Sequence, residues 1–338
     1  MRVALLREPG ELVVTERPAP QPPAGHVLIR VSAVGVCGSD THYFDHGRIG
    51  DFVVESPLVL GHEAAGVVEA VGEGVTALRP GRRVSIEPGV PDFTCEQCLA
   101  GRYNLCPGMR FFATPPIDGA FAEYVTVHEA FAHPVPDELS DDAAALLEPL
   151  SVAVWACRKA RVGPGDRVLV TGAGPVGLLA LQTARAFGAT DVTVQDINPD
   201  RLAVARTLGA DRTRDAREPW PAGETRPPTV LLECSGAAVA AAGGIRALDR
   251  AGRAVLIGMG AADIPLPVSV IQQRELTVTG TFRYAGTWPA AIALAASGRV
   301  NLDALVTGHY DLADARHALT AARDVPGSVK VIVRPHGA

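Results

Sequence analysis

The chain has little lysine and no run of basic residues. Of the 31 Lys and Arg among its 338 residues, only Lys159 and Lys330 are lysine, and the formal net charge is −6. We interpret the use of arginine, together with abundant Ala, Gly and Pro, as codon bias and not as a functional feature. Because nucleic-acid-binding domains carry clustered basic residues, the electrostatic footprint of nucleic-acid binding is missing.

Long apolar runs are also missing. The longest uncharged stretch, 168–184, contains Gly172, Gly174, Pro175 and Gly177, whereas a membrane span needs about 20 apolar residues. It is better interpreted as a buried strand followed by the start of a helix. The first apolar run is broken by charged residues and a proline at 7–9, so no signal peptide is expected.

The cysteine pattern does not resemble a disulfide framework. Three of the six cysteines cluster and three are dispersed, which predicts metal ligands plus reduced core thiols. This pattern favours the cytoplasm as the compartment. The six are Cys37, Cys95, Cys98, Cys106, Cys157 and Cys234.

The texture of the sequence predicts an α/β protein of two domains. Roughly the first 150 residues contain short β-branched runs separated by Gly and Pro, typical of an irregular β domain. After Ser140 a helical pattern begins, and Pro149 is expected to divide it into two helices. From Arg167 strands alternate with helices, the signature of a doubly wound parallel sheet. The run 329–333 is expected to close the chain as a final strand.

The segment VLVTGAGPVG at 168–177 combines a strand, a glycine turn and the start of a helix. In G-x-G-x-x-G, the first glycine permits the turn, the second admits the phosphates and the third allows close packing. The helix amino terminus then attracts the pyrophosphate. Asp196 ends the next strand, about 20 residues on, where a carboxylate binds both ribose hydroxyls and repels a 2′-phosphate. This pattern predicts NAD and not NADP.

A second set of residues offers metal ligands. Cys37 follows an apolar strand, and His62 and Glu63 follow the apolar run at 56–61. A thiolate, an imidazole and a carboxylate suit Zn²⁺, and three protein ligands leave a position for water or substrate. Taken singly, each residue has an ordinary alternative: a buried thiol, a core histidine or a surface glutamate.

The combined pattern resembles the zinc signature of the medium-chain dehydrogenase/reductase superfamily. That signature consists of Cys37-Gly38-Ser39-Asp40, then Gly61-His62-Glu63 with Gly66, Gly72 and Val75. Other segments, spread over essentially the whole chain, resemble its polyol (sorbitol/xylitol) dehydrogenase branch: His42-Tyr43, GRIGDF at 47–52, GRYNLC at 101–106, FFATPPIDG at 111–119, EPLSV at 148–152 and FRYAGTWP at 282–289.

The resemblance implies a GroES-like catalytic zinc domain at 1–150 and 284–338, interrupted by a Rossmann NAD-binding domain at 151–283, with the active site in the cleft. It makes Cys37, His62 and Glu63 the zinc ligands. Glu148 becomes a close carboxylate, bound through water or exchanging onto the metal, so that the third ligand is Glu63 or Glu148. The implied substrate-binding residues are Tyr43, Glu148, Arg283 and Tyr284. The implied NAD contacts are Gly172, Gly174, Pro175, Val176, Gly177, Asp196, Arg201, Ile257, Gly258, Met259, Thr281, Phe282 and Arg283.

The clustered cysteines suggest a second metal. Cys95, Cys98 and Cys106 have the spacing C-x₂-C-x₇-C, with Asp92 three residues earlier. Relatives with a structural zinc carry four cysteines here, so aspartate takes the first place. A closed Asp-Cys₃ zinc site that braces a loop is expected, and a vestigial lobe without metal is the alternative.

The predicted activity is zinc- and NAD-dependent oxidation of a secondary hydroxyl of a polyol to the ketone, in a homo-oligomer (tetramer or dimer) with no nucleic-acid or membrane partner. The proton leaves through Ser39, the cofactor ribose and His42, or through water held by Glu148. A cyclic polyol or amino-polyol is the nearest rival substrate, and threonine or sugar dehydrogenation is a more distant one. Two other rivals are a zinc-braced nucleic-acid-binding protein and a zinc-free quinone reductase of the same fold.

Overall fold

The computed structural model describes residues 1–221 and 223–337. The chain forms two compact units, Met1–Glu148 with Leu302–Ala338, and Pro149–Asn301. Residues 284–301, which the sequence analysis assigned to the catalytic domain, lie in the second compact unit. The predicted limits of the catalytic and NAD-binding domains remain a prediction. Among the described residues, no helix combines the length and apolarity that crossing a bilayer requires.

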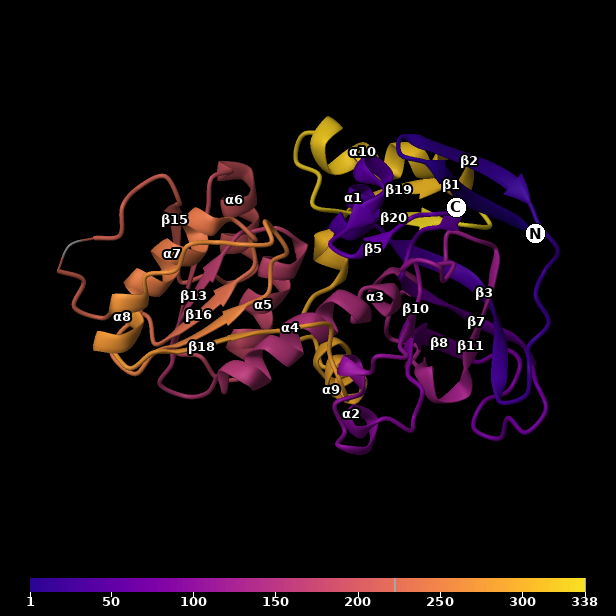
Figure 1. The fold of residues 1–338 in the computed structure, drawn as a ribbon, viewed down its shortest axis with the longest axis horizontal. Helices are drawn as coiled ribbons and strands as arrows, with labels where there is room; N and C mark the ends of the chain where they lie inside the picture. The colour runs from indigo at the N-terminus through magenta and orange to yellow at the C-terminus, as the bar shows by residue number, and fades with distance from the viewer. Residues whose placement is uncertain (222, 338) are drawn as a thin grey trace. The chain divides into compact units, whose positions relative to one another are not determined.

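The first unit is built on antiparallel β-sheet (Figure 1). Its largest sheet has seven strands in the order β12-β8-β7-β3-β20-β19, with β11 also paired to β3. All pairs in this sheet are antiparallel except β19 with β20. Its strands are β3 (His26–Gly35), β7 (Glu63–Val71), β8 (Arg83–Ile86), β11 (Tyr124–His128), β12 (Ala132–Pro134), β19 (Val306–Asp311) and β20 (Lys330–Arg334).

Smaller sheets and short helices complete this unit. A three-stranded sheet has the order β2-β1-β6, and two further two-stranded sheets join β4 to β5 and β9 to β10. Apolar side chains between the sheets, with fully buried Phe121 and Ile29 among the largest, form its core. The other strands and the α-helices of this unit are β1 (Arg2–Glu8), β2 (Glu11–Glu16), β4 (Arg48–Ile49), β5 (Phe52–Val53), β6 (Leu58–Val59), β9 (Gly89–Val90), β10 (Arg110–Phe111), α1 (Gly38–His46), α2 (Glu96–Leu99), α3 (Asp141–Ala145) and α10 (Ala315–Asp324).

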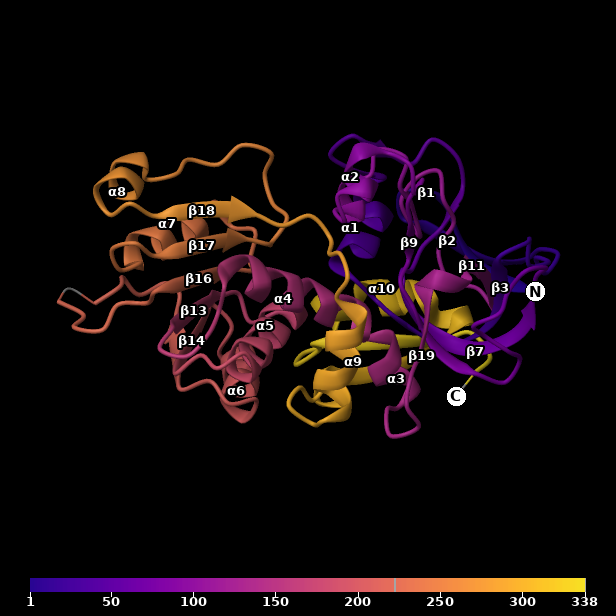
Figure 2. The same ribbon diagram turned by 90° about the horizontal axis from the view of Figure 1, so that it is seen from below.

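The second unit contains a six-stranded parallel sheet in the order β15-β14-β13-β16-β17-β18. This is the strand order of a Rossmann fold, and it confirms the doubly wound sheet. Helices α5 and α6 lie on one side of it and α7 on the other (Figure 2). Its elements are β13 (Arg167–Thr171), β14 (Asp191–Asp196), β15 (Arg212–Asp215), β16 (Val230–Glu233), β17 (Arg253–Leu256), β18 (Thr277–Gly280), α5 (Pro175–Ala186), α6 (Pro199–Thr207), α7 (Ala238–Ala247), α8 (Val268–Gln273) and α9 (Trp288–Ala296).

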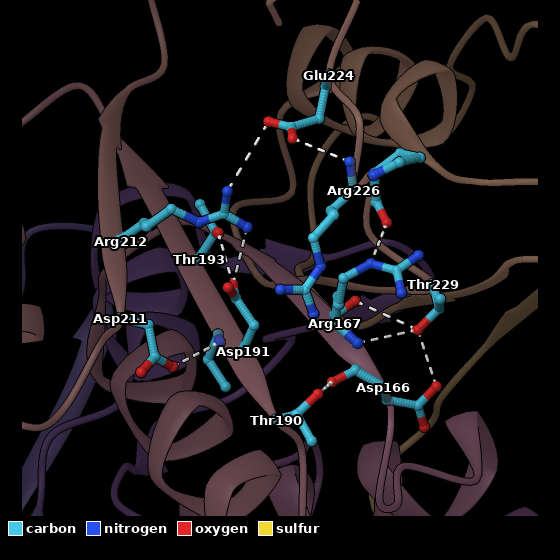
Figure 3. Close-up of polar contacts among 12 residues, drawn as sticks. Asp166, Arg167, Thr190, Asp191, Thr193, Asp211, Arg212, Glu224, Arg226 and Thr229 are labelled. Carbon is cyan, nitrogen blue, oxygen red and sulfur yellow. Dashed lines mark hydrogen bonds and ion pairs between the residues drawn. The ribbon is translucent and has the colours of Figure 1, made fainter.

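Polar contacts hold the amino ends of these strands (Figure 3). The Thr229 hydroxyl donates to Asp166 at 2.8 Å, and Arg167 donates to the Pro227 carbonyl at 2.7 Å. At the starts of β14 and β15, Arg212 pairs with Asp191 at 2.9 Å. The carboxyl ends, where ligands of open α/β sheets bind, lie at the opposite edge.

One expected helix break lies elsewhere. The chain divides the helical segment at Leu146, between α3 and α4 (Leu147–Ala160), whereas Pro149 lies inside the first turn of α4. A proline is tolerated there because the first-turn N–H groups have no partner within the helix. The prediction of two helices is confirmed, and the position of the break was wrong.

Candidate functional site

Three predicted ligands come together in the first unit. Cys37 caps the amino terminus of α1 just after β3, while His62 and Glu63 lead into β7. Strands β3 and β7 pair so that Gly35 lies opposite Glu63. One ligand atom from each of Cys37, His62 and Glu63 lies within 4.8 Å of the other two.

The donor set and its burial fit Zn²⁺. His62 is 8% and Glu63 1% exposed, and Cys37 is half-buried. Glu63 Oε2 is fully buried and lies 2.5 Å from the ammonium nitrogen of Lys330. A thiolate, an imidazole and a carboxylate placed this close together form a donor set that would hold a zinc ion.

Asp40 ties the two ligand segments together, a role that the sequence reasoning did not assign to it. Its carboxylate accepts the Cys37 N–H at 3.0 Å and the Gly61 N–H at 2.9 Å, and lies 3.5 Å from His62 Nδ1. A carboxylate at Nδ1 favours a proton there and leaves Nε2 as the metal-binding atom. Burial opposes ionisation of Asp40, but neighbouring His62 and the two N–H donors lower the pKa of Asp40 overall.

Lys330 also reaches this cluster, and the sequence reasoning missed it as well. Its Nζ lies 2.6 Å from Glu63 Oε1 and 2.7 Å from the Val36 carbonyl oxygen. Burial opposes the charge of the ammonium, but Glu63 and then Cys37 raise the pKa of Lys330 above its usual value. The available signal was a scarce residue type placed within the apolar strand VKVIV.

The other residues predicted near the metal lie outside the group formed by Cys37, His62 and Glu63. Ser39, His42 and Tyr43 lie on α1, where Tyr43 is buried and His42 is exposed with its ring 4.6 Å from that of His46. Glu148 is 5% exposed in the first turn of α4. Its carboxylate is not part of the three-ligand group.

The glycine turn of the second unit has the geometry that its motif predicts. Gly172 has φ +88°, a left-handed conformation. A Cβ on Gly177 would lie 1.8 Å from the Gly172 carbonyl oxygen, so that position requires close packing. A Cβ on Gly174 would meet no atom within 4 Å, which leaves open space at the amino terminus of α5. Pro175 begins that helix, followed by Val176.

The remaining predicted cofactor residues lie at or beyond the carboxyl ends of neighbouring strands. Asp196 ends β14, is 9% exposed, and accepts the N–H groups of Ala173 at 2.6 Å and Asn198 at 2.8 Å. Each carboxylate oxygen keeps capacity for a further donor. Arg201 lies on α6. The segments 257–259 and 281–283 follow β17 and β18.

Two predicted substrate residues belong to this second unit. Arg283 has φ +53°, and its guanidinium lies 4.8 Å from the centre of the Phe282 ring. Tyr284 is buried, with its ring 5.2 Å from that of Trp288 in an edge-on arrangement.

The cysteine lobe forms a second candidate metal cluster. One ligand atom from each of Asp92, Cys95, Cys98 and Cys106 lies within 4.8 Å of the others, and the Cys95 and Cys98 sulfurs are 3.4 Å apart. The backbone N–H groups of Cys95 and Thr94 donate to Asp92 and lower its pKa to about 2. An ionised carboxylate with three thiols is consistent with a structural zinc.

Comparison with known proteins places these sites in a family. Residues 23–137 match the model of the alcohol dehydrogenase GroES-like domain, and residues 175–297 match that of zinc-binding dehydrogenases. The sorbitol dehydrogenase of Gallus gallus is 43% identical over 96% of this chain and 94% of its own length. The chain therefore belongs to the zinc-containing medium-chain dehydrogenase/reductase superfamily. It is an oxidoreductase of the zinc alcohol/polyol dehydrogenase class, closely related to sorbitol dehydrogenases, which confirms the resemblance.

Solved relatives extend the likeness to the whole fold. An Escherichia coli CFT073 protein described as a short chain alcohol dehydrogenase complexed with NADH superimposes with a TM-score of 0.90, 29% identity and 99% coverage of both chains. A zinc-binding dehydrogenase from Sinorhizobium meliloti 1021 bound to NADP gives a TM-score of 0.91, 30% identity and 99% coverage of both. Since these relatives carry different cofactors, the choice of cofactor depends on this chain's own residues.

Proposed function

We propose that this chain oxidises a secondary hydroxyl of a sorbitol- or xylitol-like polyol to the ketone and transfers the hydride to NAD. The observation that carries the proposal is the group of half-buried Cys37 and buried His62 and Glu63, whose ligand atoms lie within 4.8 Å of one another. When bound there, zinc supplies a Lewis acid that lowers the pKa of the substrate hydroxyl and fixes its position.

The chain's own residues hold and orient this site. Asp40 orients His62, and Glu63 serves as the third ligand, with Glu148 as the alternative. The proton released from the substrate passes through Ser39 and His42, or to water held by Glu148. Tyr43, Arg283 and Tyr284 supply hydrogen-bonding groups for further hydroxyls, which distinguishes a polyol from a simple alcohol.

NAD is the proposed cofactor because Asp196 ends β14 as a buried carboxylate. There it would accept hydrogen bonds from both ribose hydroxyls and repel a 2′-phosphate. The Gly172 turn and the α5 amino terminus would hold the pyrophosphate, and Arg201, 257–259 and 281–283 would contact the rest of the cofactor.

A panel of substrates tests the proposed activity. Linear sugar alcohols, cyclitols and amino-cyclitols are supplied at equal concentration with NAD, and NADH is followed by its absorbance. We expect the highest kcat/KM with a linear polyol. Turnover of cyclitols alone would show that the substrate is a cyclic polyol and not a linear one. If the zinc-loaded enzyme oxidises no polyol, the proposed activity is rejected.

Gly174→Ala tests the dinucleotide turn. The new methyl group would extend into open space next to the α5 amino terminus, and we expect NADH affinity to fall by roughly tenfold or more. Because alanine caps a helix less well than glycine, the free energy of unfolding should fall by only about 1 kcal/mol. NADH fluorescence titration and thermal melting measure the two effects.

Gly163→Ala is the matched control, since its Cβ would also meet no atom within 4 Å. It should leave NADH affinity unchanged. An unchanged affinity in Gly174→Ala would show that the phosphates bind elsewhere.

The cysteine lobe is proposed to hold a second zinc, which predicts two zinc ions per chain. Carboxylate is a harder ligand than thiolate, so this zinc should be the first lost to a mild chelator. Its loss should lower the melting temperature before it lowers kcat, because a closed site only braces a loop. Metal analysis, melting and assays at successive chelator concentrations measure the order.

Asp92→Cys supplies the matched variant, since four thiolates should slow the loss of this zinc. One zinc per chain in freshly prepared wild-type enzyme, with Cys95, Cys98 and Cys106 all freely titratable, would instead identify a vestigial lobe.

A further inference from the structure

Lys330 is a buried ammonium beside the proposed metal ligands. Its side chain is 3% exposed, whereas Lys159, the chain's other lysine, is exposed on α4. A buried charge is costly unless it is paired and hydrogen-bonded. The contacts that Lys330 makes therefore indicate why a lysine occupies this position.

Those contacts join the two segments that carry the ligands. Nζ donates to the carbonyl oxygen of Val36, the residue before Cys37, and to Oε1 of Glu63, the residue after His62. It also lies 2.5 Å from Glu63 Oε2. One ammonium thus links the chain at Cys37 to the carboxylate of Glu63.

The backbone fixes Lys330 relative to these segments. Strand β20, which begins at Lys330, pairs with β3 so that Ile332 lies opposite Gly35. The Val36 N–H also donates to the Val331 carbonyl at 3.0 Å. The sheet therefore fixes the backbone position from which the Lys330 side chain reaches these segments.

Gly35 makes room for the Glu63 carboxylate on the neighbouring strand. A Cβ at Gly35 would lie 2.1 Å from Glu63 Oε2, so the carboxylate occupies the space that the missing side chain leaves. With Gly35 and Lys330 both in contact with it, the carboxylate has little freedom to turn away from Cys37 and His62.

We propose that Lys330 is a positioning residue of the metal centre, which clamps Glu63 and the Cys37 segment in the arrangement that binds zinc. This inference rests on the proposed function, in which Cys37, His62 and Glu63 hold that zinc. The ammonium also offsets the charge of a thiolate and a carboxylate brought together in a buried place. Partners of metal ligands typically change metal affinity by about 10- to 100-fold.

The test measures zinc release from the full-length chain. Wild type, Lys330→Met, Cys37→Ser and the matched control Lys159→Met are mixed with excess chelator, and zinc retained per chain is followed over time. Zinc is expected to leave each site in its own kinetic phase, and the phase that is missing in Cys37→Ser identifies the Cys37 site. In Lys330→Met that phase should be about 10- to 100-fold faster. The phase of the Asp92 cluster and the rates in Lys159→Met should stay at wild-type values.

The selectivity between phases separates positioning from general destabilisation, which would accelerate both. Zinc release from the Cys37 site of Lys330→Met at the wild-type rate overturns the inference, because Lys330 would then have no clamping effect. Slower release also overturns it, because the main effect of Lys330 would then be repulsion between its ammonium group and the metal ion. So does equal acceleration of both phases.

Two further outcomes are distinguishable. If Cys37→Ser lacks no phase, the proposed metal site itself fails. If Lys330→Met does not fold by circular dichroism, Lys330→Arg decides. A planar guanidinium does not reproduce the contacts of a single ammonium nitrogen. Faster zinc release from the Cys37 site alone therefore supports the clamp, and an unchanged rate overturns it.

Discussion

Cys37→Ser is expected to lower kcat/KM by about a thousandfold or more while NAD affinity stays nearly unchanged. A neutral hydroxyl is a far weaker zinc ligand than a thiolate, and the loss of several kcal/mol of metal-ion stabilisation corresponds to a rate factor of this size. NAD affinity should persist because the glycine turn and Asp196 belong to the other compact unit. Initial rates, NADH titration and metal analysis of the same preparation measure these effects.

Cys157→Ser is the matched control. This thiol is fully buried within α4 and belongs to neither metal cluster, so its replacement should leave the zinc content unchanged. Full activity in Cys37→Ser with no zinc lost would remove Cys37 from the metal site.

Asp196→Ala is expected to weaken NAD by about 10- to 100-fold and to raise kcat/KM with NADP. A hydrogen bond to a charged group contributes about 1.5–3 kcal/mol, so the net loss of one of the two ribose contacts already accounts for the first effect. Removing the carboxylate also removes its repulsion of a 2′-phosphate, which accounts for the second. Kinetic constants with both cofactors measure the change.

Part of any loss in Asp196→Ala is structural, because Asp196 accepts the N–H groups of Ala173 and Asn198. Thermal melting of the same variant quantifies that part. Glu275→Ala, which removes an exposed carboxylate just before β18, should leave the cofactor preference unchanged. A wild-type preference for NADP would contradict the role given to Asp196.

Local features of the nucleotide unit were predictable from short segments. The turn at Gly172 needs a left-handed residue, and Gly177 needs the absence of a Cβ, so both requirements appear in six consecutive residues. The alternation of strands and helices likewise follows from runs of apolar residues ended by glycine. The helix break near Pro149 was misplaced because the helix tolerates a proline in its first turn. The backbone N–H groups there have no partner within the helix, so the missing N–H of proline costs no helical hydrogen bond.

The metal site was predictable only in part. The residue types of Cys37, His62 and Glu63 suit zinc, but each alone has an ordinary structural explanation, and the family resemblance was needed to join them. Asp40 lay within the recognised segment without an assigned role. Its hydrogen bonds to Cys37 and Gly61 depend on how the two segments meet.

The sequence by itself determined the dinucleotide turn, the alternation of strands and helices in the second unit and the chemistry of the candidate ligands, because these depend on backbone conformation and side-chain type within short windows. Only the tertiary structure decided that Gly35 lies opposite Glu63 and that Lys330, 267 residues from Glu63 along the chain, contacts its carboxylate. The physical reason is that strand register sets such contacts, and register arises from burial of whole sheet faces and not from the residues in contact.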